Sequence, residues 1–418
     1  MLDDSPKKVE MLRKGRSIIP GFLFQLFQPL YHWTLAWVAA INYGFPSKSM
    51  KIIGVTGTKG KSTTALMVTK IFEQQGKAVA MIGSLGFKIR DKEWPNTLKM
   101  TMPGRFKLQK FLYEAKHAGC EYVVIEVTSE GIAQKRLSGV YVDCAVFTNL
   151  HKEHIENHGS FEAYKKAKLY LFRKVKNIHV INKENIYSDE FLAPSSKKLI
   201  TYGLERGDVT QKILGINLQL MGVFNVYNAL AAISVAHIYG LDFLKAKATV
   251  EAIKFVPGRM EYVEVGQPFD VIVDYAHTPE SLEYVYQTLK PASGRLICVL
   301  GAAGGGRDKW KRPVFGEIAA NYCDDIILTN EDPYDEKPEK ILDDISVGIL
   351  QSKDGSSNGS DIKKILDRTE AINFAIHGAK SGDVVIITGK GSEISMALAN
   401  GKKMDWSDRE VVIKALHR

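Results

Sequence analysis

The residues from Lys51 to Val68, KIIGVTGTKGKSTTALMV, combine side chains and spacing that could bind phosphate groups. An apolar run enters a glycine-containing turn, and a segment rich in helix-forming residues follows. Backbone N–H groups of such a turn and helix N-terminus can surround phosphate oxygens, while lysine neutralises charge and a hydroxyl reaches Mg²⁺. The residues that supply these groups are Gly57, Thr58, Gly60, Lys61, Ser62 and Thr63. The strict GxxxxGKS/T pattern requires glycine where Val55 stands, but the strand, turn and helix together predict nucleotide binding.

An acidic residue and a group of histidines follow two later apolar runs. Glu126 ends the run EYVVIE, where a carboxylate could be a ligand of Mg²⁺; a solvent-facing acid at a strand end is the alternative. The segment TNLHKEHIENHG places His151, His154 and His158 close together. Because no cysteine partner or HExxH pattern accompanies these histidines, the sequence does not predict zinc.

Apolar strands alternate with helical segments in two series, which predicts an α/β fold with mostly parallel sheets covered on both faces. The strand candidates are KIIGVTG, AVAMIGSLG, EYVVIEVTS and DCAVFTNL in the first series and FDVIVDYAH, RLICVLGA, DDIILTNED and DVVIITGKG in the second. Each ends in polar or glycine-rich residues, where open α/β sheets place ligands. We therefore predict an N-terminal helical segment (1–50), a central P-loop nucleotide-binding domain (51–256) and a C-terminal Rossmann-like domain (257–418).

Composition favours an ordinary globular protein with anionic partners. The 418 residues are 45% hydrophobic and carry a net charge of +9, but the basic residues are scattered and no nucleic-acid-binding signature accompanies them. Phosphorylated substrates would suit this charge. The four cysteines are far apart, with neither CxxC spacing nor a disulfide-like framework, which favours a reducing cytoplasm.

The N-terminal segment places basic residues before an aromatic stretch at 18–45. Pro20, Pro29 and several polar residues interrupt this stretch, so no membrane-spanning helix is predicted. Apolar residues recur on one helical face. They are Leu30, Trp33, Trp37, Val38 and Ile41. We favour a helix packed on the next domain over contact of 18–45 with a membrane surface.

Ordered motifs across about residues 51–416 resemble the Mur ligase family, most strongly its UDP-N-acetylmuramoyl-tripeptide synthetase (MurE-type) branch. They are TGTKGKST, EVTSEG, TNLHKEHIENHG, YKKAKLYLF, GVFNVYNALAA, PGRMEYVEVGQPF, VDYAHTPESLEYV, GAAGGGRDKWKRP, ILTNEDP and ITGKGSE. The resemblance implies that ATP phosphorylates a carboxylate, and that an amino group attacks the acyl phosphate to give an amide, ADP and phosphate. It also implies Mg²⁺ as a cofactor.

The resemblance assigns catalytic and metal-binding roles to particular side chains. Lys61 would contact the β- and γ-phosphates, and Ser62 and Glu126 would share one Mg²⁺. His154 matches a ligand of a second Mg²⁺. Lys168 matches the lysine that the family carbamylates, a change from cation to anion that would let it coordinate metal. Without the resemblance, Lys168 would be one lysine of a solvated helix face.

Further matches concern the nucleotide. Asn225 and Asn228 match nucleotide-side asparagines, although Asn225 is also a credible helix N-cap. Arg259 and Asp274 match positions that approach the phosphate and the ribose. Two further motif residues, without an assigned role, are His277 and Lys309. If the C-terminal domain supplies these groups, domain closure must complete the site.

The chain departs from the resemblance on the acceptor side. The phosphate loop begins only about fifty residues in, so we expect no room for the family's uridine-nucleotide domain. The matching substrate contacts are Thr101, Ser129, Gln134 and Arg136. The alternatives are therefore the same chemistry on a pseudomurein, folate polyglutamate or lipid-linked acceptor, or a non-catalytic nucleotide-binding scaffold. Retention of the matched phosphate and metal residues argues against a scaffold.

The incoming amino acid is also in question. Where diaminopimelate-adding enzymes carry Asp-Asn-Pro-Arg, this chain has Glu331, Asp332, Pro333 and Tyr334, and the lost arginine removes a bidentate carboxylate partner. Glu331, Asp332 and Glu393 would suit a distal ammonium such as that of lysine, unless they are merely surface acids. The implied partners are an anionic peptide precursor and an amino acid, with no nucleic acid, and we expect a cytoplasmic monomer.

Overall fold

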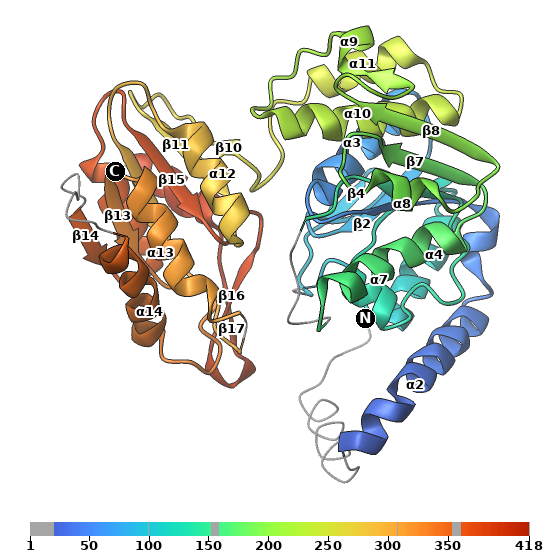
Figure 1. The fold of residues 1–418 in the computed structure, drawn as a ribbon, viewed down its shortest axis with the longest axis horizontal. Helices are drawn as coiled ribbons and strands as arrows, with labels where there is room; N and C mark the ends of the chain where they lie inside the picture. The colour runs from blue at the N-terminus through green and yellow to red at the C-terminus, as the bar shows by residue number, and fades with distance from the viewer. Residues whose placement is uncertain (1–20, 99, 152–158, 307, 353–360, 418) are drawn as a thin grey trace.

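The computed structural model describes residues 21–98, 100–151, 159–306, 308–352 and 361–417. These residues form two lobes, each built around its own sheet, with a helix extending from the first lobe (Figure 1). The fold class predicted from the sequence is confirmed. The domain boundaries at residues 51 and 257 stay a prediction.

The first lobe contains a nine-stranded sheet of described residues. In spatial order its strands are β4 (Lys92–Trp94), β3 (Gly86–Ile89), β2 (Val79–Gly83), β5 (Tyr122–Glu126), β1 (Lys51–Thr56), β6 (Cys144–Phe147), β7 (Ile178–Asn182), β8 (Lys198–Gly203) and β9 (Val209–Thr210). The neighbouring pairs from β2 to β9 are parallel, and β3 and β4 add an antiparallel edge. Because β1 lies between β5 and β6, the ends of these three strands meet beside the phosphate loop.

Helices cover both faces of this sheet because successive strand residues point in opposite directions. Ile53 belongs to a core with α3, α10 and α11, whereas Ile52 belongs to a second core with α4, α5, α7 and α8. The helices are α3 (Lys61–Gln74), α4 (Arg105–His117), α5 (Ser129–Ala133), α7 (Phe161–Lys174), α8 (Ser188–Leu192), α9 (Gln211–Leu214), α10 (Val223–Ile238) and α11 (Phe243–Glu251).

The second lobe repeats this layered plan. Its six-stranded sheet runs β10 (Glu261–Tyr262), β11 (Asp270–Asp274), β15 (Val384–Thr388), β12 (Leu296–Leu300), β13 (Asp325–Leu328) and β14 (Asp361–Lys364), parallel except for β10. One face packs on α12 (Pro279–Leu289), α13 (Lys311–Tyr322) and α14 (Pro338–Gln351), and the other on α15 (Arg368–Gly378) and α16 (Asp408–Leu416). A small hairpin joins β16 (Ser395–Ala397) to β17 (Lys403–Asp405).

The N-terminal helix α2 (Gly21–Asn42) extends away from the first lobe (Figure 1). It contacts α4, and among its residues with a described side chain the buried ones are the small Ala36, Ala39 and Ala40. The apolar face singled out in the sequence is mostly not the packing face, since Leu30, Trp33, Val38 and Ile41 remain exposed. Trp37 is half-buried and packs on Phe45, with 5.8 Å between the ring centres. Among the described residues, no helix is long and apolar enough to cross a membrane.

The cysteine prediction was wrong. Cys298 in β12 and Cys323 after α13 form a disulfide with a Cα–Cα distance of 6.1 Å. The two residues are 25 positions apart, and the packing of α13 beside the sheet brings them together. The two remaining cysteines, Cys120 and Cys144, are free and buried. The cysteines therefore no longer argue for a reducing compartment.

Candidate active site

The phosphate loop connects the end of β1 to the start of α3. Gly60 is the N-cap of α3 at φ 81°, a conformation that favours glycine, and a Cβ there would lie 2.2 Å from Asn228 Oδ1. Lys61 Nζ donates to the carbonyl oxygens of Gly57 at 2.9 Å and Thr58 at 2.8 Å. Its ammonium thus lies over the loop, close to where the predicted phosphates would bind.

Ser62 and Glu126 meet because β1 and β5 are adjacent parallel strands. Ser62 Oγ donates to Glu126 Oε2 at 2.9 Å, and Glu126 is buried at the end of β5. A hydroxyl and a carboxylate at one point are oxygen ligands of the kind Mg²⁺ takes with phosphates and waters. The solvent-facing alternative for Glu126 is excluded by its burial. No group of three or more histidine, cysteine or acidic residues that could hold a metal ion occurs among the described residues.

Ser84 is a site residue that the sequence analysis did not identify. Its backbone N–H donates to Glu126 Oε1 at 2.8 Å, and its hydroxyl lies 2.8 Å from that of Ser62. These contacts fix the orientation of the carboxylate. The only signal in the sequence was the position of Ser84 at the end of an apolar run.

Lys168 lies at the phosphate loop and not on a solvated helix face. It is 2% exposed, and its Nζ donates to the carbonyl oxygen of Gly57 at 2.8 Å. The same ammonium lies 4.6 Å from the ring centre of Tyr164, whose hydroxyl is 3.0 Å from Thr58 Oγ1. Helix α7 therefore places a buried lysine beside the phosphate loop, and its carbamylation stays a prediction. His154 lies outside the described residues.

The two asparagines of α10 lie against the start of α3. Thr64 Oγ1 donates to Asn228 Oδ1 at 3.3 Å, and Asn228 Nδ2 donates to Asn225 Oδ1 at 3.2 Å. The N-cap prediction for Asn225 was wrong, because Gly222 is the N-cap and Asn225 lies in the first turn. Asn225 instead donates to the carbonyl oxygen of Met221 at 2.7 Å. Both asparagines border the predicted nucleotide site.

The second lobe contributes Arg259 on the loop before β10. Its guanidinium lies 4.5 Å from the ring centre of Tyr275, and its buried Nε has no hydrogen-bond partner within the described residues. Buried Asp274 accepts hydrogen bonds from the backbone N–H groups of Met260 at 2.6 Å and Ala276 at 2.7 Å. Burial raises the pKa of Asp274, opposed by Arg259, those two bonds and Lys59 of the phosphate loop. Asp274 thus holds the loop that carries Arg259.

The two motif residues without an assigned role make local contacts in the second lobe. His277 Nδ1 lies 2.8 Å from the carbonyl oxygen of Tyr275, and Lys309 forms an ion pair with Glu336 at 3.2 Å. Neither of these two contacts involves the phosphate loop, and a role for His277 or Lys309 stays a prediction.

The acceptor-side residues fall into two groups. Arg136 is buried, and its Nη2 donates to Gln134 Oε1 at 2.8 Å, so this predicted pair does lie together. Burial lowers the pKa of Arg136. Ser129 is buried at the start of α5, where its hydroxyl donates to Glu130 at 3.3 Å. Thr101 instead lines the pocket between the lobes.

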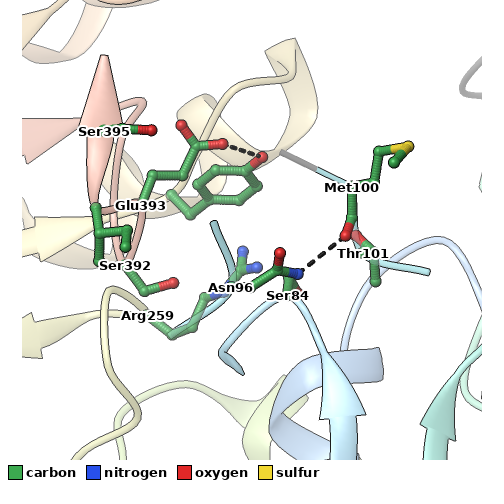
Figure 2. A pocket seen from close by; sticks show the side chains of 10 residues that line it. Ser84, Asn96, Met100, Thr101, Arg259, Ser392, Glu393 and Ser395 are labelled. Atoms are coloured by element: carbon green, nitrogen blue, oxygen red, sulfur yellow. Dashed lines mark hydrogen bonds between the residues drawn. The ribbon is translucent and has the colours of Figure 1, made fainter. Parts of the chain in front are cut away.

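That pocket joins residues of both lobes (Figure 2). The first lobe supplies Ser84, Asn96, Met100 and Thr101, and the second supplies Arg259, Tyr275, Ser392, Glu393, Ile394 and Ser395. Tyr275 donates a hydrogen bond to Glu393 at 3.4 Å across one wall. The serine that orients Glu126 therefore opens on the same space as Arg259 and Glu393.

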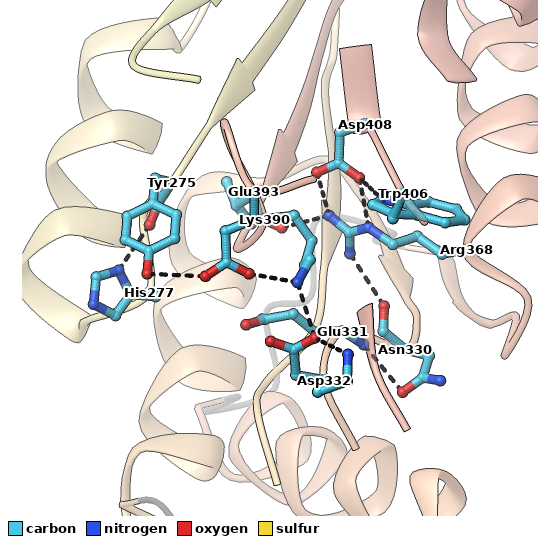
Figure 3. Close-up of polar contacts among 12 residues, drawn as sticks. Tyr275, His277, Asn330, Glu331, Asp332, Arg368, Lys390, Glu393, Trp406 and Asp408 are labelled. Atoms are coloured by element: carbon cyan, nitrogen blue, oxygen red, sulfur yellow. Dashed lines mark hydrogen bonds and ion pairs between the residues drawn. The ribbon is translucent and has the colours of Figure 1, made fainter. Parts of the chain in front are cut away.

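The three acids predicted to contact the amino acid, Glu331, Asp332 and Glu393, are not fully exposed on the surface (Figure 3). Glu331 and Asp332 are buried, and Lys390, also buried, donates to Asp332 at 2.9 Å and Glu393 at 2.5 Å. Asp332 also accepts from the backbone N–H of Ala397 at 2.7 Å. Lys390 thus offsets two of the three carboxylates.

Glu331 lies three residues after the end of β13, and no ion pair with another described residue is seen for it. Burial raises its pKa to about 7, although the nearby Lys390 opposes this shift. Beside it, Arg368 donates to both carboxylate oxygens of Asp408, at 2.8 and 2.7 Å (Figure 3). The sequence analysis missed Lys390 and this buried pair because lysine, arginine and aspartate are common surface residues.

Comparison with known proteins follows the same division into lobes. The model of the Mur ligase middle domain matches residues 55–236, and that of the Mur ligase glutamate ligase domain matches 258–391. The UDP-N-acetylmuramoyl-L-alanyl-D-glutamate--2,6-diaminopimelate ligase of Syntrophomonas wolfei is 36% identical over 406 residues, which cover 91% of this chain and 81% of that protein. The chain belongs to the Mur ligase family.

Other comparisons agree with the resemblance of this Mur ligase to the MurE-type branch. The UDP-N-acetylmuramyl-tripeptide synthetase of Roseiflexus is 37% identical over 438 residues, covering 96% of this chain and 84% of that protein. A solved UDP-N-acetylmuramoyl-L-alanyl-D-glutamate--2,6-diaminopimelate ligase has a TM-score of 0.59 and 31% identity, covering 88% of this chain and 78% of its own. The family prediction is confirmed.

Proposed function

We propose that this Mur ligase is an ATP-dependent amide ligase that joins an amino acid to the carboxylate of a cell-wall peptide precursor. The observation that carries the proposal is the meeting of Lys61, Ser62 and Glu126 at one glycine-rich loop, with Lys168 beside them. Cationic and hydroxyl groups suit phosphates, and the buried carboxylate suits Mg²⁺. The names of the relatives agree with this chemistry.

ATP would supply the phosphoryl group that activates the acceptor carboxylate, and Mg²⁺ would offset charge on the phosphates. In this chain, Lys61 would hold the phosphates, while Ser62 and Glu126 would orient the metal. Arg259 would add positive charge from the second lobe. The amino group then attacks the carbonyl carbon of the acyl phosphate. A C–N bond forms, the bond from that carbon to the bridging oxygen breaks, and phosphate leaves with the bridging oxygen.

Gln134 and Arg136 would position the acceptor. Arg136 is a buried guanidinium beside an amide, an arrangement that can bind a carboxylate or phosphate through two hydrogen bonds. The sulfur of Met100 accepts from Arg136 at 3.6 Å, and Met100 lines the pocket between the lobes together with Glu393. Closure of the lobes around the substrates would exclude water and protect the activated carboxylate from hydrolysis.

The incoming amino acid in this proposal is a diamino acid with a distal ammonium, such as lysine. Tyr334 stands where an arginine would bind a distal carboxylate, and Glu331 and Glu393 are acids near the pocket. A cation would favour the ionised form of Glu331. We further propose a monomer in the cytoplasm, where ATP is available.

The decisive experiment measures phosphate release from the purified protein with ATP and Mg²⁺. UDP-muramoyl-dipeptide would be combined in turn with lysine, ornithine and meso-diaminopimelate, and Lys61→Ala and Glu126→Gln would serve as inactive controls. We expect release only when acceptor and one amino acid are both present. If ATP binds without such coupled release, the screen would be repeated with a lipid-linked muramoyl-peptide. No release with that acceptor either would identify a nucleotide-binding scaffold.

A further inference from the structure

Helix α2 presents an apolar face that the first lobe does not cover. Leu30 is 59% exposed, Trp33 48%, Val38 48% and Ile41 64%. The helix packs through its small alanines on the opposite side, which leaves these larger residues pointing away from the lobe. Together with Tyr31, which is 52% exposed, they form what we call the exposed face of α2.

Positive charges outnumber negative ones on the helix that supports this face. No aspartate or glutamate occurs between residues 11 and 72, and α2 has neither acidic residues in its first turn nor basic residues in its last. The helix α4 that supports it has one acid, Glu114, against several cations. The cations of α4 are Arg105, Lys107, Lys110 and Lys116.

Helix α2 also lies near the proposed acceptor site, through its half-buried His32. Arg105 of α4 donates a hydrogen bond to the carbonyl oxygen of Gln134. Burial, and then the nearby charges of Arg105 and Arg136, lower the pKa of His32 on α2. The helix is thus a neighbour of the residues that would position the acceptor.

We propose that the exposed face of α2 docks on an anionic lipid bilayer. Tyrosine and tryptophan side chains suit the boundary between headgroups and acyl chains, since their rings are apolar and their polar ends reach water. Basic residues beside such a helix are attracted to anionic lipid. A second copy of this chain would bring like charges together across the same face, which disfavours self-association. Docking would bring the acceptor site of the proposed ligase to the bilayer surface.

Vesicle co-sedimentation of the full chain tests this proposal without ATP or acceptor, so its result does not depend on the proposed ligase activity. Vesicles of phosphatidylcholine alone would be compared with vesicles that also contain phosphatidylglycerol. The test variant is Leu30→Glu/Ile41→Glu. The matched control is Ile213→Glu/Leu244→Glu, which adds the same charge at residues that are 72% and 74% exposed elsewhere on the first lobe.

We expect the wild type and the control to sediment with anionic vesicles and much less with neutral ones. The Leu30→Glu/Ile41→Glu variant should bind roughly tenfold more weakly or worse, because it loses apolar contact and gains repulsion. Circular dichroism would verify that both variants are folded. A wild type that stays in the supernatant would overturn the proposal, as would equal loss in the control. A wild-type dimer in light scattering that only Leu30→Glu/Ile41→Glu dissociates, without vesicle binding, would overturn it in favour of a second copy.

Discussion

Two buried ionisable side chains, Lys168 and Glu331, have separate roles in the proposed reaction. Lys168 would serve the phosphate site, and Glu331 would bind the incoming amino acid. Lys168 donates to the phosphate loop in the first lobe, and Glu331 lies in the segment that follows β13 in the second. Burial of an ionisable group is costly unless other groups compensate it or a ligand uses it. Each therefore gives a prediction at the scale of a single residue.

Replacement of Lys168 by alanine should lower phosphate release at least about a hundredfold, because the proposed carbamate would no longer hold metal. Added formate or acetate should restore part of the activity by supplying a carboxylate in the vacated space. The neighbouring Lys166→Ala is the control on the same helix. Carbon-13 NMR with labelled bicarbonate would detect the carbamate directly, and full activity in Lys168→Ala would contradict its role.

Glu331 should make binding of a cationic amino acid depend on pH. Its pKa is about 7, and the ionised carboxylate is the form that attracts an ammonium. The KM for lysine should therefore fall as the pH rises from 6 to 8, by up to about tenfold per pH unit below 7. Glu331→Gln should have a high KM without this pH step, whereas the exposed Glu339→Gln should behave as wild type. A pH-independent KM in the wild type would rule out this role.

At the scale of elements, Glu184 joins three parts of the first lobe after β7. Its carboxylate accepts from the backbone N–H groups of Leu204 at 2.8 Å, Glu205 at 2.8 Å and Arg206 at 2.9 Å, and from the hydroxyl of Tyr227 at 2.6 Å. Burial would raise its pKa, but these hydrogen bonds lower it to about 2. The turn after β8 and helix α10 are thus held by one ionised side chain.

Glu184→Gln should lower the free energy of unfolding of the first lobe by about 1–2 kcal/mol at pH 7. Because the folded-state pKa lies below the unfolded value near 4.3, this stabilisation is present above that value and disappears as the pH falls through about 2. Urea unfolding at pH 7 and pH 3 would measure the difference. A variant whose deficit does not shrink at the lower pH would show that the ionised carboxylate is not the cause.

The elements that could be predicted from the sequence are those with a strong local pattern. The runs ending at Thr56 and Glu126 are strands in the structure, and the turn and helix that follow β1 lie where the GKST motif places them. Contacts between residues far apart in the sequence leave no local pattern. The disulfide between Cys298 and Cys323 and the position of Ser84 beside Glu126 therefore could not be predicted. The predicted packing face of α2 was mostly wrong, because the buried residues are alanines, whereas four of the five periodic large residues are exposed.

At the scale of the whole molecule, the two lobes share one pocket. Ser84 and Arg259 line it from opposite lobes, and Lys403 Nζ donates to the carbonyl oxygen of Thr97 at 3.1 Å across the same boundary. A reaction that uses side chains from both lobes depends on how closely the two lobes approach each other. Arg259 is the residue on which this dependence can be measured.

Arg259→Ala should reduce turnover by about a hundredfold while changing ATP affinity only a few fold, because its charge would act mainly on the closed state. Lys403→Ala, which removes an exposed contact between the lobes, is the control and should retain activity within about twofold. Steady-state kinetics and nucleotide titration would separate the two effects. Equal losses of affinity and turnover in Arg259→Ala would place the arginine in ground-state nucleotide binding.

The carbonyl oxygen of Gly57 accepts hydrogen bonds from two ammonium groups, those of Lys61 and Lys168. Phosphate would compete with this carbonyl for Lys61, and a carbamate on Lys168 would be an anion that no longer donates to it as the ammonium does. Formation of the active site would therefore remove both of these hydrogen bonds to the phosphate loop. Carbon dioxide and nucleotide would then act on the same peptide unit, so that loading with one should alter the rate at which the other is taken up.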